Sequence, residues 1–428
     1  MSRHSIPYGR QSIEIDVPDD RLNGILRSRL HDLRPAQDGP ALVRQALARP
    51  IGGPRLRELA QGKKNIVILA SDHTRPVPSK VIMPPLLDEL RQGNPGAAIT
   101  ILIATGCHRA TTGAELARKF GEDIIAKEKI VLHDCDDLSM LVPLGDLPSG
   151  GRLLINRLAA EADLVVSEGF IEPHFFAGFS GGRKSVLPGI AGRATVLHNH
   201  NAAFIDHPNS RAGVLSDNLV HADMLYAAGK AGLAFIVNVV LNELGEVVYS
   251  AAGDPDLAHR AGCDFLLRQC QVRRLPADIV VVSNGGYPLD QNIYQAVKGM
   301  NTAAECVRPG GAIIMFAQSG DGHGGEAFYR LFEKGGSPDA ILSRVRSAAG
   351  EDTIPDQWQA QILCRVLTRA KVVYISDLAD DLTRAFHMLP AHSFPEALRI
   401  AAGLSGDANG SITIIPDGVS VIVTETEA

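Results

Sequence analysis

The chain has 428 residues, which is enough for two α/β domains of about 100–200 residues each. Hydrophobic residues make up 45% and charged residues 21%, the composition of a globular protein with a large core. The 42 basic and 48 acidic residues leave a net charge of −6, so no positive excess attracts nucleic acid or an anionic membrane.

The N-terminal segment and the cysteines predict a cytoplasmic protein. The N-terminal segment lacks the apolar run of a signal peptide, and no stretch is long enough to cross a membrane. Six cysteines are scattered without a CxxC pair, which predicts reduced thiols and argues against a cysteine cage for a metal.

Seven short apolar runs predict strands, and each is followed by a glycine-rich or polar turn and a helical stretch. Runs so poor in charge are typical of strands buried on both faces of a parallel sheet, which favours a doubly wound α/β architecture. The runs lie at residues 65–70, 98–104, 162–167, 234–240, 277–283, 312–316 and 372–376. The intervening residues 81–93 and 292–300 predict helices.

A charged, proline-ended segment at residues 271–276 predicts a domain boundary. It separates an N-terminal domain over residues 1–270 from a C-terminal α/β domain over residues 277–405, with the active site in the cleft between them. Residues 411–425 have hairpin character, because a Pro-Asp-Gly turn stands between two apolar runs. The tail over residues 406–428 packs on one of the two domains.

Side chains of catalytic type follow four of the predicted strands. In open α/β sheets, ligands bind outside the carboxyl ends of the strands, so one shared crevice explains these positions better than four separate sites. The residues concerned are Asp72, Arg75, His108, His174, Lys184, His200, Tyr294, Gln295 and Lys298.

Each of these residues also has a structural interpretation. A loop histidine is more often solvated or satisfied within a core, but His108 and His174 each follow a buried strand. Arg75 can form an ordinary surface salt bridge. Tyr294 and Lys298 lie four residues apart on one helix face, where they form either a carboxylate receptor or a tyrosine stem packed beneath an exposed lysine.

The segment GFSGGRKS at residues 178–185 nearly matches the phosphate loop of nucleotide hydrolases. Arg183 occupies the second glycine position, and the following VLPGIAG interrupts the helix that such a loop should begin. The segment still presents Lys184 on a permissive loop, as a simple anion contact or as a point of covalent attachment.

Taken together, these motifs resemble the nickel-dependent lactate racemase family over nearly the whole chain. The matching segments are DHTRPVPS, ATGCHR, EPHFFAGFSGGRKSVLPGIAG, HPNSRAGVL and SNGGYPLDQNIYQAVKGM, in the expected order. The resemblance implies an isomerase that racemises or epimerises a small 2-hydroxy acid. Family members act on lactate, malate and other hydroxy acids, so several substrates stay open.

The same resemblance implies a nickel-pincer nucleotide, pyridinium-3-thioamide-5-thiocarboxylic acid mononucleotide, bound in the N-terminal domain and made by dedicated maturation enzymes. Lys184 matches the lysine of the covalent link, and His200 matches the protein ligand of nickel. An imidazole beside sulfur donors suits square-planar nickel(II). Asp72 matches an active-site acid that orients a histidine or holds the cofactor.

The resemblance also assigns the remaining site residues. His108 and His174 match two acid/base residues that handle the substrate hydroxyl proton while the α-hydrogen moves as hydride. The residues matching the substrate pocket are Arg75, Tyr294, Gln295, Lys298 and Trp358. Two alternatives remain: a nucleotide-binding enzyme with a phosphate loop, and a non-catalytic relative that only binds hydroxy acids.

Overall fold

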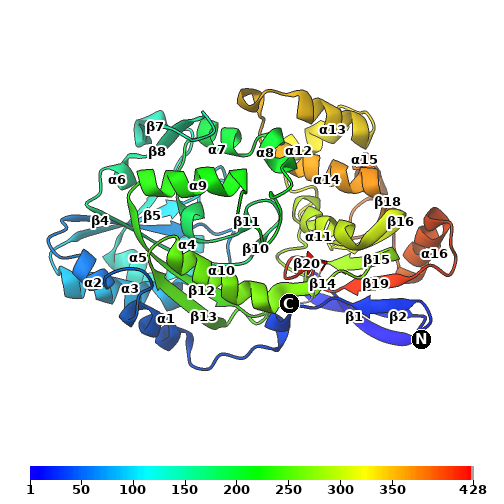
Figure 1. Ribbon diagram of the computed structural model, residues 1–428, viewed down its shortest axis with the longest axis horizontal. Coiled ribbons are helices and arrows are strands. Elements are labelled where there is room, and N and C mark those ends of the chain that lie inside the picture. The colour runs from blue at the N-terminus through cyan, green and yellow to red at the C-terminus, as the bar shows by residue number, and fades with distance from the viewer. Residues whose placement is uncertain (426–428) are drawn as a thin grey trace. The chain divides into compact units, whose positions relative to one another are not determined.

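The computed structural model describes residues 1–425, which form two compact units (Figure 1). The larger unit comprises Leu30–His200 and His207–Leu267, and the smaller unit comprises Met1–Arg29, Asn201–Asp206 and the chain from Arg268 onward. Each unit is built on a six-stranded, mainly parallel sheet, so the predicted fold class of two α/β domains is confirmed.

The sheet of the larger unit has the strand order β13-β12-β9-β4-β5-β6. Its neighbours are parallel except for β13, which runs antiparallel to β12. The strands are β4 (Asn65–Ser71), β5 (Ala98–Ala104), β6 (Lys129–Leu132), β9 (Leu164–Phe170), β12 (Leu233–Leu241) and β13 (Val247–Gly253). The central strand β4 is buried at five consecutive positions, because its uncharged side chains are covered on both faces.

The helices of the larger unit cover this sheet and fill its core with aliphatic side chains. The α4 helix begins at a capping box, in which the Thr112 side chain accepts from Glu115 N and the Glu115 carboxylate accepts from Thr112 N. The helices are α1 (Gly39–Ala48), α2 (Leu56–Leu59), α3 (Ser79–Gly93), α4 (Gly113–Phe120), α5 (Glu122–Lys127), α6 (Arg157–Ala160), α7 (Arg193–Asn199), α9 (Leu219–Lys230) and α10 (Leu257–Cys270).

The sheet of the smaller unit has the order β18-β17-β16-β15-β19-β3, and all its neighbours are parallel. The strands are β3 (Leu22–Ile25), β15 (Ala277–Ser283), β16 (Val307–Phe316), β17 (Lys371–Ile375), β18 (Leu389–Ala391) and β19 (Ile412–Ile415). The helices are α8 (Ala202–Asp206), α11 (Ile293–Cys306), α12 (Glu326–Glu333), α13 (Pro338–Ser347), α14 (Gln357–Arg369), α15 (Asp380–Ala385) and α16 (Phe394–Ser405).

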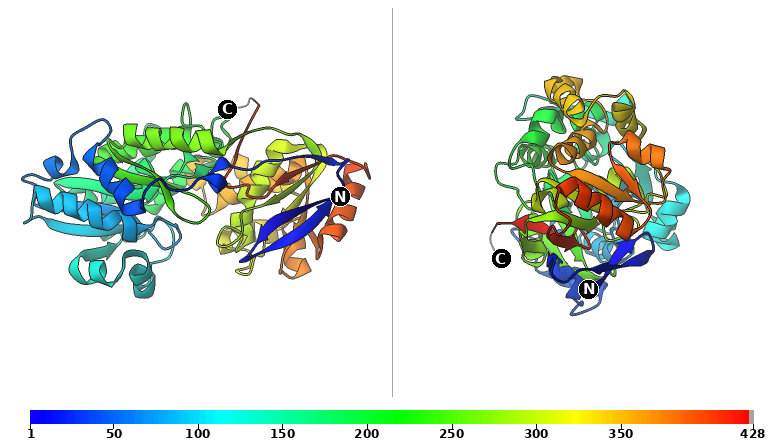
Figure 2. Two further views of the ribbon diagram at one scale, coloured as in Figure 1. Left: turned by 90° about the horizontal axis from the view of Figure 1, so that it is seen from below. Right: turned by 90° about the vertical axis from the view of Figure 1, so that its right-hand side faces the viewer.

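Several short elements complete the two units. An N-terminal hairpin, β1 (Ser2–Tyr8) with β2 (Gln11–Val17), packs Ile6, Ile15 and Val17 into the core of the smaller unit. In Figures 1 and 2 this blue hairpin lies beside the red C-terminal strands and α16. The other short elements are β7 (Leu141–Asp146), β8 (Arg152–Asn156), β10 (Pro173–His174), β11 (Gly178–Phe179), β14 (Gln271–Arg273), β20 (Ile422–Thr424), η1 (Arg29–Asp32), η2 (Leu138–Met140), η3 (Gly182–Ser185) and η4 (Gly350–Asp352).

All seven runs predicted to be strands are strands, and the two predicted helices correspond to α3 and α11. The predicted C-terminal hairpin is wrong. Its two apolar runs form β19 and β20, which pair in parallel with β15 and β14 respectively. The physical reason is that β19 is buried at all four positions, so it lies inside the sheet rather than at a hairpin edge.

The chain also departs from the predicted domain boundaries at its start. Residues 1–29 lie with the smaller unit, because β3 pairs with β19 and the first hairpin packs on the same sheet. Residues 406–425 of the tail, whose position the sequence left open, belong to the smaller unit as well. Within residues 1–425, every helix is too short or too polar to cross a membrane.

Candidate functional site

Asp72 and His108 meet at two neighbouring strand ends in the larger unit. The last residues of β4 and β5, Ser71 and Ala104, are paired in register. His108 Nδ1 lies 2.7 Å from Asp72 Oδ2, and Asp72 Oδ1 accepts from the backbone N and the hydroxyl of Thr74 at 3.1 and 2.6 Å. Because the carboxylate is an acceptor, His108 carries its proton on Nδ1 and leaves Nε2 as a base.

This pair combines a buried anion with an accessible ring. The side chain of Asp72 is 2% exposed, whereas that of His108 is 45% exposed. Burial alone would raise the pKa of Asp72, but the hydrogen bond and charge of His108, together with Thr74 and Arg75, lower it to about 2. The carboxylate is therefore ionised at any pH near neutrality.

Arg75 lies on the same loop as Asp72, and α4 anchors that loop from behind. The Lys119 ammonium on α4 reaches the backbone carbonyls of Arg75 and Val77 at 3.4 and 3.5 Å. Burial lowers the pKa of Lys119. Arg75, the predicted substrate-binding cation, therefore extends from a loop whose backbone is held in place by Lys119.

A second group in the larger unit gathers around the ring of Phe176. The rings of His174 and His200 pack edge-on against it, with centroids 4.5 and 5.2 Å away. The Lys184 ammonium lies 5.9 Å from the same ring centroid. The structure thus brings together three predicted residues, and Phe176 is a member that sequence reasoning missed. Its signal in the sequence was its place directly after His174 and Phe175 in the most specific motif.

The two histidines of this group differ in environment. His200 is 5% exposed, and burial together with the charge of Lys184 lowers its pKa to about 3, so its imidazole is neutral. His174 is partly exposed and accepts a hydrogen bond from Ala177 N at Nδ1, at 3.2 Å. Neutral His174 therefore carries its proton on Nε2, opposite to His108.

The glycine-rich segment around Lys184 is shaped by tight packing. Gly181 has a φ of 79°, and a Cβ there would lie 2.8 Å from the carbonyl oxygen of Phe170. The buried Arg183 guanidinium donates to the carbonyls of Phe179 and Ala177 at 2.8 and 2.6 Å, and burial lowers the pKa of Arg183 to about 10.

These contacts explain the arginine in the near-match to a phosphate loop. Lys184 lies in η3, a single 3-10 turn, and the next α-helix, α7, starts only at Arg193. A phosphate loop needs backbone N–H groups at the start of a helix directly after its lysine. The segment instead forms a compact turn that holds Lys184 beside His200.

The remaining predicted residues lie together in the smaller unit. Asn292 caps α11 by accepting from Gln295 N at 2.9 Å, which places Tyr294, Gln295 and Lys298 on the first turns. Trp358 Nε1, on α14, donates to the Tyr294 hydroxyl at 3.1 Å. Buried Gln295 Oε1 has no hydrogen-bond partner among residues 1–425. The predicted site thus falls into two groups, one in each unit, and their common cleft stays a prediction.

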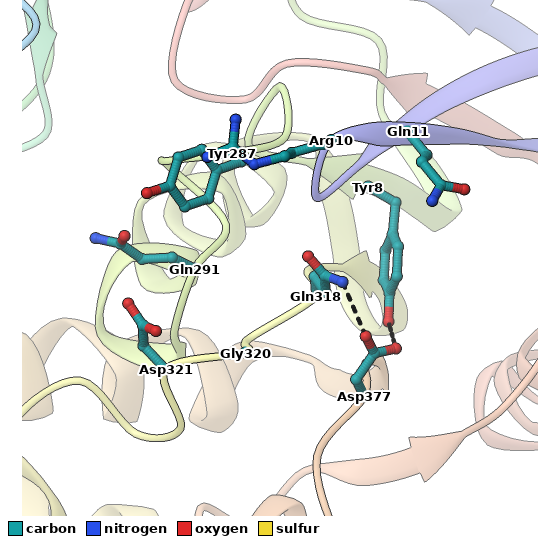
Figure 3. Close-up of a pocket in the computed structure, with 9 residues that line it drawn as sticks. All are labelled: Tyr8, Arg10, Gln11, Tyr287, Gln291, Gln318, Gly320, Asp321 and Asp377. Carbon is teal, nitrogen blue, oxygen red and sulfur yellow. Dashed lines mark hydrogen bonds between the residues drawn. The ribbon is translucent and has the colours of Figure 1, made fainter.

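The smaller unit also has a cavity of about 540 Å³ beyond the carboxyl ends of β15, β16 and β17 (Figure 3). In Figure 3 the Tyr8 hydroxyl and the Gln318 amide point to Asp377, with hydrogen bonds of 2.6 and 3.0 Å. The Arg10 guanidinium lies 4.0 Å from the centroid of Tyr287. The described residues that line this cavity include none of the residues predicted from the sequence.

Comparison with known proteins matches both parts of the chain to one family. The family model for the lactate racemase N-terminal domain matches residues 8–213, and the model for the lactate racemase C-terminal domain matches residues 272–423. The lactate racemase of Thermoanaerobacterium thermosaccharolyticum is 50% identical over 99% of this chain and 100% of its own length. That of Lactiplantibacillus plantarum is 49% identical over 98% and 99%.

Solved structures agree with these matches. The lactate racemase apoprotein from Thermoanaerobacterium thermosaccharolyticum superposes with a TM-score of 0.96, covering 99% of this chain and 100% of its own, at 50% identity. A Thermotoga maritima protein is 19% identical with a TM-score of 0.66, over 90% of this chain and 98% of its own. At that identity the second likeness shows the fold alone.

Proposed function

Since the chain belongs to the lactate racemase family and is a racemase, we propose that it interconverts the enantiomers of a small 2-hydroxy acid, with lactate as the first candidate. The observation that carries this proposal is the pair of opposite histidine tautomers in the larger unit. His108 Nδ1 faces the Asp72 carboxylate, so the Nε2 of neutral His108 can accept a proton, whereas His174 Nδ1 accepts from Ala177 N, so the Nε2–H of neutral His174 can donate. Racemisation needs a base and a donor for the substrate oxygen.

The residues around Phe176 fit the nickel-pincer nucleotide. A metal requires a deprotonated ligand nitrogen, and the lowered pKa of His200 keeps its imidazole neutral. Lys184 lies close enough for its charge to act on that ring. We therefore infer that Lys184 would hold the nucleotide covalently and His200 would bind its nickel. When bound, the group supplies a hydride acceptor for the α-hydrogen, which is too weakly acidic for histidine to remove as a proton.

The other residues bind and orient the substrate in this proposal. Arg75 and Lys298 hold its carboxylate, because charge-assisted hydrogen bonds to a carboxylate are strong and directional. The buried Gln295 Oε1 and the Tyr294–Trp358 pair line the pocket. Asp72 holds His108 in the tautomer that accepts the hydroxyl proton. Dedicated maturation enzymes supply the nucleotide.

The test is a panel of enantiopure hydroxy acids offered to protein co-produced with the maturation enzymes. Chiral chromatography should show either lactate enantiomer converging on the racemic mixture. The control is Lys184→Ala, prepared in the same way, which should neither carry an adduct nor turn over. A different acid processed faster would change the substrate assignment. No turnover of any acid by protein that carries nickel and the adduct would overturn the proposed function.

A further inference from the structure

The turn of the N-terminal hairpin forms one wall of the cavity shown in Figure 3. Gly9 N donates to the buried carboxylate of Asp290 at 2.6 Å, and Tyr287 N donates to the carbonyl of Gly9 at 2.8 Å. Gly9 has a φ of 56°, and a Cβ on it would collide with the side-chain amide of Gln318. The turn is therefore held at the carboxyl edge of the sheet, and Arg10, the next residue, lines the cavity.

A second wall consists of polar groups that satisfy one another. Asp377 Oδ1 accepts from the Tyr8 hydroxyl at 2.6 Å, and Asp377 Oδ2 accepts from the Gln318 amide at 3.0 Å. Burial and the neighbouring Asp377 raise the pKa of Tyr8, so its hydroxyl stays protonated and keeps donating. These three side chains therefore shape the cavity and leave other groups to bind a ligand.

The cavity also carries polar groups that the described part of the chain leaves without a partner. The Arg10 guanidinium stacks on the ring of Tyr287, 4.0 Å from its centroid, and such a stack leaves the N–H edge of the guanidinium open. Within residues 1–425, the side chains of Arg10, Gln291 and Asp321 make neither a hydrogen bond nor an ion pair. In Figure 3, Gln291 and Asp321 lie on the same side of the cavity as the stack. A ligand there would meet a cation, an amide and a carboxylate together.

The volume and the open groups define the chemistry of the ligand. The cavity of about 540 Å³ falls within the range of roughly 300–1,000 Å³ that small-molecule sites occupy. A guanidinium edge binds a carboxylate or a phosphate through two parallel hydrogen bonds, and an ionised carboxylate such as Asp321 only accepts, for example from hydroxyls. An anion without hydroxyls would meet two carboxylates, Asp321 and Asp377, beside one cation. The ligand therefore needs hydroxyls as well as a negative charge.

A metal ion is a weaker explanation for the same cavity. Its two carboxylates attract cations, but both oxygens of Asp377 already accept hydrogen bonds, and the Arg10 guanidinium lines the same space. Among residues 1–425, neither Asp321 nor Asp377 belongs to a group of three side chains that could hold a metal ion.

We propose that this cavity binds an anionic sugar, either a sugar acid or a sugar phosphate, with its charged group on Arg10 and its hydroxyls on Asp321 and Gln291. None of the described lining residues is assigned to racemisation, so binding there does not depend on the proposed function. The backbone beside the cavity also supports α11, because Asp321 N donates to Gln291 O at 2.8 Å and Tyr294 N donates to His323 O at 3.2 Å. A bound sugar would therefore steady the segment that caps α11.

Calorimetric titration of the full-length protein with four probes tests the chemistry of the ligand. Glucuronate and glucose 6-phosphate carry both kinds of group, whereas glucose lacks the charge and propionate lacks the hydroxyls. At least one anionic sugar should bind on the order of tenfold more tightly than glucose and propionate, and the tighter of the two identifies the charged group. Binding of neither anionic sugar, or equally tight binding of glucose or propionate, would overturn the proposed site.

Four variants test the contacts. Arg10→Gln should weaken binding of the anionic sugar by on the order of tenfold to a hundredfold, whereas Arg399→Gln, an exposed arginine on α16, is the matched control and should bind normally. Asp321→Ala should weaken binding, because hydroxyls lose their acceptor. Tighter binding in Asp321→Ala would mean that the carboxylate only repels an anion, and would overturn the hydroxyl contact. Lys298→Ala should bind normally, and a loss there would move the sugar to the racemase pocket.

Hydrogen exchange locates the bound sugar by a readout that does not depend on affinity. Arg10 and Asp321 are exposed, so their variants should fold and serve as comparisons. In wild type, saturating sugar should slow exchange in peptides covering residues 287–295 and 318–323, and the same concentration should leave Arg10→Gln unchanged. Protection confined to other segments would overturn the location.

Discussion

Replacing Asp72 by asparagine tests whether the carboxylate sets the tautomer of His108. Asparagine keeps the shape of Asp72, and its amide oxygen can still accept from Thr74. Its amide nitrogen would then face His108 Nδ1, where Asp72 Oδ2 now lies at 2.7 Å. A donor at that position favours a proton on Nε2, which removes the base.

The expected loss can be worked from the pKa of Asp72. The step from the ordinary value of 3.8 to about 2 corresponds to about 2 kcal/mol of stability from the folded-state contacts of the carboxylate. Because the folded-state pKa is lowered, this stability is fully present above pH 3.8 and is lost as the pH falls through about 2. Turnover should fall by on the order of a hundredfold to ten-thousandfold, the contribution of a positioned general base.

Urea unfolding and racemisation kinetics measure the two effects. Asp72→Asn should cost about 2 kcal/mol at pH 7, and the difference from wild type should shrink as the pH is lowered below 4. Asp72→Ala, which leaves the ring free to take either tautomer, should retain more turnover than Asp72→Asn. Asp137→Asn is the matched control, because Asp137 makes the same contacts to a residue two positions on, Ser139 N and Oγ at 2.9 and 2.6 Å. Near-normal turnover in Asp72→Asn would refute the tautomer argument.

Four further substitutions test the other assignments. Lys184→Ala, purified after maturation, should lack the mass adduct of the wild type, and an adduct retained on that variant would remove Lys184 from the proposal. His200→Ala should lose bound nickel by metal analysis while His198→Ala keeps it, and the reverse result would reassign the ligand. Lys298→Ala should weaken substrate binding by about 1.5–3 kcal/mol, on the order of tenfold to a hundredfold in KM, with adduct loading intact. Unchanged KM would rule out a carboxylate contact. Arg183→Met should lower the free energy of unfolding by about 2–4 kcal/mol, because the buried carbonyls of Phe179 and Ala177 lose their donor. A variant as stable as the wild type would contradict a stabilising role for these two hydrogen bonds.

The strands and their polar carboxyl ends could be predicted from the sequence because both are local properties. Uncharged, β-branched runs such as residues 65–70 have few stable positions other than a buried strand. Side chains that follow parallel strands must collect at one edge of the sheet, which is why Asp72 and His108 could be expected together. In the structure His108 Nδ1 lies 2.7 Å from Asp72 Oδ2, and the crevice shared by all four strand ends stays a prediction.

The pairings of distant segments depended on tertiary structure. Residues 1–29 carry no signal for the smaller unit, yet β3 pairs with β19 across almost the whole chain. The C-terminal Pro-Asp-Gly turn indicated a hairpin by local rules. Burial of β19 on both faces of the sheet stabilises the fold more than a local antiparallel pairing would.

The same division holds within the candidate site. Residue types and motif order in the sequence were enough to name Lys184, His174 and His200 as candidates, because the kind of group that a side chain carries is written in the sequence. The proton positions on the histidines, the neutral state of His200 and the burial of Arg183 depended on folding. Ala177 donates to His174, and Lys184 acts on His200, only in the folded chain. The periodicity of the sequence does not encode the geometry of these contacts or the burial of the side chains.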